Sequence, residues 1–120
     1  MRASEALILG STMLMPVRRT FDDSKGHGCA LGMINRALGG NNVNRIYRTV
    51  FPWMSGTAVS HPLHPMQHSN VENTVVSLFD NFDWSVGRIA DWLETVDPTP
   101  REITEIAAEN NSAVELAQRV

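Results

Sequence analysis

The sequence predicts an all-α fold, a bundle of five or six short helices with one long irregular loop at about residues 55–70. Two observations favour this fold. Apolar residues recur at the spacing of one helix face in several separate stretches. Between these stretches stand prolines, glycines and small polar residues that begin or end helices. Because 120 residues correspond to one ordinary domain, we expect residues 1–120 to form a single helical domain.

The first helix is expected to begin at a Ser4 cap and to run to about Leu14. Pro16 then ends it, because the residue before a proline is restricted to extended conformations. Residues 17–25 alternate weakly between apolar and polar side chains, which predicts either a short strand or a loop.

A second helix is expected to begin at Cys29 and to end at Gly39 and Gly40, which readily adopt the left-handed geometry of helix ends. Asn42 is the expected cap of a third helix over residues 43–50.

After the irregular loop, three further helix starts are visible. Asn70 precedes a stretch with apolar residues at helical spacing, and Ser85 precedes a second one. Thr99, with Pro100 at the first helical position, predicts a last apolar helix near the C-terminus.

Composition excludes several classes of protein. The formal net charge of −3 and the scattered basic residues argue against a nucleic-acid surface and against binding to anionic membranes. A single cysteine allows no internal disulfide, and no apolar run approaches the length of a membrane span. The apolar N-terminal stretch is interrupted by Glu5 and lacks a cleavage site of small residues, so we expect a cytoplasmic protein.

The only cysteine, Cys29, supports two interpretations. At the start of a helix, a thiol faces unpaired amides that stabilise a thiolate, which is the nucleophile of a cysteine-dependent hydrolase or transferase. In that case a histidine of the irregular loop supplies the base and Asp80 or a neighbour orients it. Alternatively, Cys29 is a small apolar residue packed in the interior, and we favour this interpretation.

Three of the four histidines lie in the irregular loop: His61, His64 and His68. Neutral imidazoles bind zinc, nickel or copper, so these residues are metal-ligand candidates. Their spacing matches no zinc motif, and the nearby prolines keep them off a common helix face. The alternative is a solvent-facing loop without metal, and we expect no cofactor.

Two segments resemble those of short, uncharacterised bacterial and phage-borne proteins. One is the Cys-Ala-Leu-Gly helix start within residues 28–32, and the other is the Asp-Asn turn at 80–81 followed by the Ile-Ala-Asp-Trp-Leu helix at 89–93. That group has no assigned activity. The resemblance therefore implies a bacterial origin and a similar fold, with Cys29 packed near the 80–81 turn.

These observations favour a non-catalytic binding or protein-interaction module that contacts a protein partner or small ligand through the loop and nearby side chains. The expected contact residues are Trp53, His61, His64, His68 and Asp80. The apolar last helix allows a homodimer. The alternatives are a metal-binding protein that uses the loop histidines and an enzyme that uses Cys29.

Overall fold

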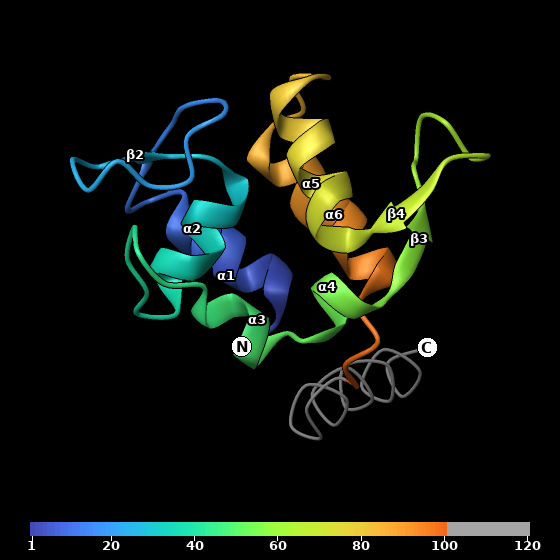
Figure 1. Cartoon of the computed structure of the whole chain (residues 1–120), viewed down its shortest axis with the longest axis horizontal. Helices are drawn as coiled ribbons and strands as arrows, with labels where there is room; N and C mark the ends of the chain where they lie inside the picture. The colour runs from blue at the N-terminus through green and yellow to red at the C-terminus, as the bar shows by residue number, and fades with distance from the viewer. Residues whose placement is uncertain (101–120) are drawn as a thin grey trace, which may run out of the picture.

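A computed structural model of the chain describes residues 1–100 (Figure 1). Within them lie ten elements: α1 (Ala3–Gly10), β1 (Met15–Pro16), β2 (His27–Gly28), α2 (Ala30–Ala37), α3 (Ile46–Val50), α4 (Trp53–Gly56), β3 (Ala58–Ser60), β4 (His68–Asn70), α5 (Val71–Asp80) and α6 (Val86–Val96). The mainly helical character predicted from the sequence is confirmed. Two small sheets are added to it.

The predicted irregular loop contains more regular structure than the sequence indicated. Helix α4 and the antiparallel pair β3–β4 both fall inside residues 53–70, and Ala58 pairs with Asn70 at the open end of the hairpin. The two prolines, Pro62 and Pro65, lie between the strands, where no ladder hydrogen bond needs their missing N–H groups. The other sheet is a short parallel pair of β1 and β2.

Helix α1 differs from its predicted bounds at both ends. Ser4 lies inside the helix, where its hydroxyl donates a hydrogen bond to Glu94, and Arg2 takes the capping position. The helix ends at Gly10, where α1 and α2 approach each other closely. A Cβ atom on Gly10 would lie 1.9 Å from the carbonyl oxygen of Met33, so only glycine fits this contact.

The second helix begins as predicted, with Cys29 in the capping position of α2 and Gly39 at a φ of 89° just beyond its end. The third helix begins later than predicted, at Ile46. The residues before it form a turn, in which the Asn44 side chain accepts a hydrogen bond from the Asn41 amide at 3.1 Å, and Val43 remains 80% exposed.

The predicted caps of the two long helices are confirmed. The Asn70 side chain accepts a hydrogen bond from the Asn73 amide at 2.7 Å at the start of α5. The hydroxyl of Ser85 accepts one from the Arg88 amide at 3.2 Å at the start of α6. The predicted last helix, after Pro100, lies outside the described residues.

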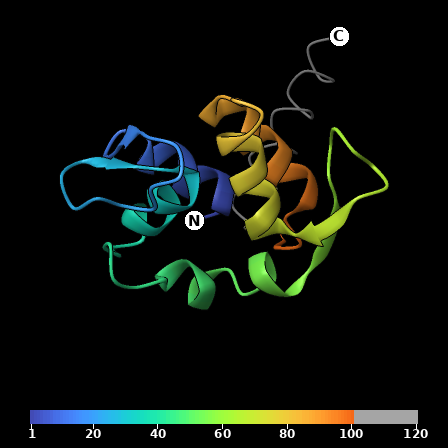
Figure 2. The same cartoon turned by 45° about the horizontal axis from the view of Figure 1, so that its top comes forward.

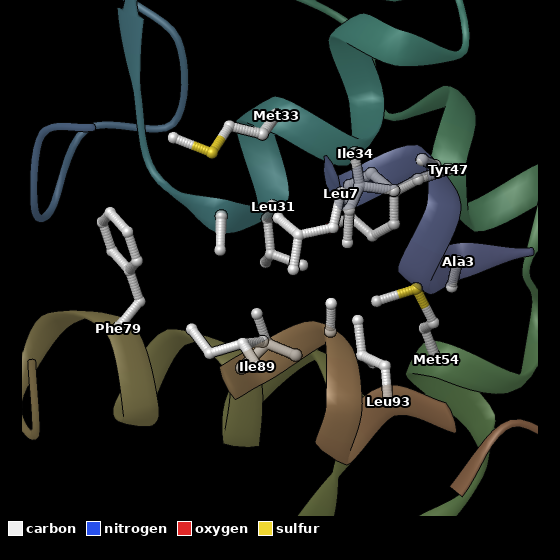
Figure 3. Close-up of a cluster of buried hydrophobic side chains, with 14 of the residues drawn as sticks. Ala3, Leu7, Leu31, Met33, Ile34, Tyr47, Met54, Phe79, Ile89 and Leu93 are labelled. Carbon is white, nitrogen blue, oxygen red and sulfur yellow. The ribbon is translucent and has the colours of Figure 1, made fainter. Parts of the chain in front are cut away.

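Helix α1 packs against both α2 and α6, and α5 packs against α2, α4 and α6. Figure 2 shows α3 and α4 along one side of these longer helices, where they connect α2 to the β3–β4 hairpin. The buried side chains converge between the helices (Figure 3), with Leu7, Ile34 and Leu93 completely buried. Each such leucine or isoleucine contributes about 1.5–3 kcal/mol to stability.

Candidate functional site

Cys29 is buried, with 8% of its surface exposed. Burial raises the pKa of its thiol above the ordinary value, and the nearby Asp80 carboxylate raises this pKa further, while hydrogen bonds from the amides of Gly32 and Leu31 lower it. The thiol is therefore protonated at neutral pH and poorly nucleophilic. These observations favour the packing interpretation over a catalytic one.

Asp80 has a structural contact in addition to its effect on Cys29. Its carboxylate accepts a hydrogen bond from the backbone amide of Arg19 at 3.0 Å. This bond fastens the loop between β1 and β2 to the C-terminal end of α5.

The loop histidines separate into two environments. His61 and His64 form a cluster of three rings with Phe82, with centroid distances of 5.2 Å between the two imidazoles and 5.3 and 5.6 Å from them to the phenyl ring. His68 lies on β4, where its Nε2 is 3.2 Å from the hydroxyl oxygen of Ser60. Sequence reasoning did not identify Phe82 as a neighbour of the histidines.

Both ring nitrogens of His61 are engaged. Nδ1 accepts a hydrogen bond from the Leu63 amide at 3.1 Å, so Nε2 carries the proton and donates to the Ser77 hydroxyl at 3.2 Å. Burial lowers the pKa of His61, and His64 lowers it further. Among residues 1–100 no group of three or more His, Cys, Asp or Glu side chains is arranged to hold a metal ion.

A small polar pocket of about 230 Å³ lies between the hairpin and α5. Its lining side chains are all polar and include two of the predicted contact histidines: His61, Gln67, His68, Ser69, Asn73, Thr74 and Ser77. Two pairs of these groups already bond one another, as Asn73 donates to Ser69 at 3.2 Å and His61 to Ser77 at 3.2 Å.

Trp53 is half-buried on α4, where its ring packs against Phe51 at a centroid distance of 6.2 Å. Its indole Nε1 is buried and has no hydrogen-bond partner among the described residues. Trp53, one of the expected contact residues, is therefore partly buried and packs against the hydrophobic core.

A larger concave surface lies elsewhere, between α1 and α6. It is a groove of about 730 Å³, lined by Met1, Ser4, Glu5, Ile8, Leu9, Thr12, Gly87, Ala90, Asp91 and Glu94. The two helices run antiparallel here, because Arg2 at the start of α1 bonds Glu94 near the end of α6 at 3.0 Å. We call this surface the α1/α6 groove.

Helical spacing assigns the residues of the α1/α6 groove to a floor and two rims. Ser4 faces α6 through its bond to Glu94, and Ile8 follows one turn later on the same line, so these two residues form the floor with Ala90. Glu5 and Leu9 belong to the next ridge of α1 and form one rim. Gly87, Asp91 and Glu94 form the opposite rim on α6.

The α1/α6 groove is apolar because α1 is apolar on two sides. Ala3, Ala6, Leu7 and Gly10 are buried toward the core. On the other side Ile8 is 46% exposed and Leu9 37% exposed, and Met1 beside them is 59% exposed. A helix that is apolar all round is normally covered all round, whereas the described residues cover only one side of α1.

Sequence reasoning did not identify this groove. The available signal was the composition of residues 3–10, where Glu5 is the only charged side chain in an otherwise largely apolar helix. A second signal was Gly87 at the second position of α6, because glycine is a poor helix former. A Cβ atom built on Gly87 meets no atom within 4 Å, so packing among the described residues does not require glycine there.

Comparisons of the chain with protein-family models, with curated proteins and with solved structures find no match. Within residues 1–100, every helix is too short or too polar to cross a bilayer. The assignment of function therefore depends on the geometry of the surfaces described above.

Proposed function

We propose that this chain is a non-catalytic protein-interaction module that holds a helix of a partner protein in the α1/α6 groove. The observation that carries the proposal is the outer side of α1, where Ile8 and Leu9 remain exposed beside a concave surface. Exposed apolar side chains that gather at a groove are typical of sites for protein partners.

The shape of the groove favours a helix as the bound element. Two antiparallel helices leave a furrow along their line of contact, and a third helix fills such a furrow with side chains at i, i+3, i+4 and i+7. The α6 rim carries no side chain at Gly87, and the floor carries only a methyl group at Ala90. Small residues at these positions let a third backbone approach closely.

Binding of a synthetic helix tests the proposal. The probe is an amphipathic peptide of about 16 residues with a leucine stripe and neutral glutamine flanks, followed by fluorescence anisotropy. We expect the full chain to bind it. Gly87→Gln should weaken binding at least tenfold, because the new side chain occupies the groove while the space around its Cβ leaves the fold intact.

The matched control is Val43→Gln, which changes an exposed apolar residue on the turn before α3. We expect this variant to bind the peptide as the unchanged protein does. Equal affinities of the Gly87→Gln variant and the unchanged protein would contradict the proposal, as would the absence of any binding.

The polar pocket beside the histidines favours a second candidate function, the binding of a small polar molecule. Its lining offers hydroxyl, amide and imidazole groups and no carboxylate.

The metal hypothesis concerns the same loop and has a direct test, which is the zinc content of the protein after dialysis. Stoichiometric zinc that is lost in a His61→Ala, His64→Ala variant would favour a metal-binding protein over both candidates.

A further inference from the structure

The charges at the rims of the α1/α6 groove indicate which kind of helix it takes. We infer that the partner helix is basic, with lysine or arginine on both sides of its apolar stripe. This inference rests on the proposed function and specifies the chemistry of the partner.

Both rims of the groove are acidic. Glu5 stands on the α1 rim, and Asp91 and Glu94 stand on the α6 rim, while none of the residues that line the groove is a lysine or arginine. Arg2 neutralises Glu94 through hydrogen bonds of 3.0 and 3.2 Å to its carboxylate. Glu5 and Asp91 form no salt bridge with any residue in the described range.

The carboxylate of Glu5 also caps α1, accepting a hydrogen bond from the Arg2 backbone amide at 2.8 Å. This bond fixes the position of the charge without cancelling it. A helix bound in the groove therefore has the Glu5 carboxylate on one flank and the Asp91 carboxylate on the other. Lysine and arginine are the residues that such a site favours.

The same charges disfavour the two occupants that the chain itself offers. A second copy bound symmetrically would bring its own Glu5 and Asp91 toward these rims, because a two-fold interface uses the same patch on both subunits. Residues 101–120 contain four glutamates and two arginines, so this segment is also negative overall. Like charges across an interface oppose both arrangements.

Three peptides that share one leucine stripe and differ in their flanks test the inference. One carries lysine, one glutamine and one glutamate at the flanking positions. At low ionic strength we expect the lysine peptide to bind about tenfold more tightly than the glutamine peptide, since two or three exposed ion pairs together give this factor. The glutamate peptide should bind more weakly than both.

The rim carboxylates provide matched variants. In the Glu5→Gln, Asp91→Asn protein, the lysine peptide should lose its advantage while the glutamine peptide binds as before, because glutamine at position 5 retains the helix cap. Asp83→Asn is the control, since it removes an exposed carboxylate that does not line the groove, and asparagine tolerates the φ of 57° found there. This control should leave the advantage of the lysine peptide unchanged.

The outcomes separate the inference from the proposed function. Equal binding of all three peptides, with each still weakened by Gly87→Gln, overturns the basic partner and leaves the groove as a docking site. No binding of any peptide overturns both. Two further results would identify a different occupant of the groove. A dimer in sedimentation that Gly87→Gln dissociates would identify a second copy of the chain. Stronger peptide binding by a full-length Ile103→Ser, Ile106→Ser variant would identify residues 101–120.

Discussion

The hydroxyl of Tyr47 donates a hydrogen bond to the carboxylate of Glu72, which lies 25 positions along the chain on α5. Tyr47 is 1% exposed and Glu72 is 7% exposed. Arg48 bonds the same carboxylate oxygen at 2.7 Å, so α3 is attached to α5 by a buried polar group that is paired on both sides. Removal of one partner from such a group leaves an unsatisfied polar atom in the interior.

The single tyrosine of the chain makes this contact observable. Burial raises the pKa of Tyr47, and the hydrogen bond to Glu72 raises it further. Because the folded state holds this proton more tightly than the unfolded state, stability is lost as pH rises above the ordinary tyrosine value of about 10. Absorbance at 295 nm should therefore rise together with the loss of helical circular dichroism. A simple titration near pH 10 with the helices intact would contradict this account.

The ion pair of Asp22 and Arg36 predicts a difference between two substitutions. Asp22 has a completely buried side chain, and Arg36 donates to its two oxygens at 2.9 and 2.7 Å. Arg36→Met leaves a buried carboxylate without its cation and should cost about 3 kcal/mol in urea unfolding. Asp22→Asn should cost less, because the Arg36 side chain is 34% exposed and can bind water. Equal, small costs for both variants would show that the pair does not hold the loop to α2.

His61 predicts a loss of stability in mild acid. Burial lowers its pKa below the ordinary 6.5, so the unfolded chain binds the proton more readily. The stability that His61 contributes is present above pH 6.5 and is lost as pH falls from there through the lowered pKa of the folded state. Unfolding in urea between pH 7.5 and 5 should show this trend. His61→Gln should reduce this trend, and an undiminished trend in that variant would contradict its assignment to His61.

Cys29 predicts slow reaction with thiol reagents. Its burial and raised pKa mean that the thiolate forms mainly when the protein opens. With a chromogenic disulfide at pH 7, the native protein should react roughly 100-fold more slowly than the chain in denaturant, and low concentrations of urea should accelerate the reaction. Rapid reaction of the native protein at pH 6 would instead support the cysteine-enzyme alternative.

The local signals in the sequence were sufficient for the later helices. Asn70 and Ser85 cap α5 and α6 as predicted, because a cap is a contact between neighbours three residues apart. Ser4 shows where such reasoning fails. Its type favours a cap, yet it lies inside α1, and its hydroxyl bonds Glu94, 90 positions away.

The hairpin and the groove could not be predicted either, because both depend on contacts that local sequence signals do not indicate. The pairing of Ala58 with Asn70 has no tight-turn motif, and prolines in the connection disguise the two short strands. The α1/α6 groove exists only because α1 and α6, far apart in sequence, lie side by side. Only the fold shows that the apolar residues Ile8 and Leu9 remain exposed beside α6.

Methyl NMR of the full-length chain tests the central claim most directly, because it reports where a helix binds. On addition of the lysine-flanked leucine peptide, we expect saturable shifts of the methyl groups of Met1, Ile8 and Leu9, with Val43 and Leu63 unchanged. Shifts centred on the β3–β4 hairpin, or no shifts at saturating peptide, would contradict the account of the α1/α6 groove as the binding surface.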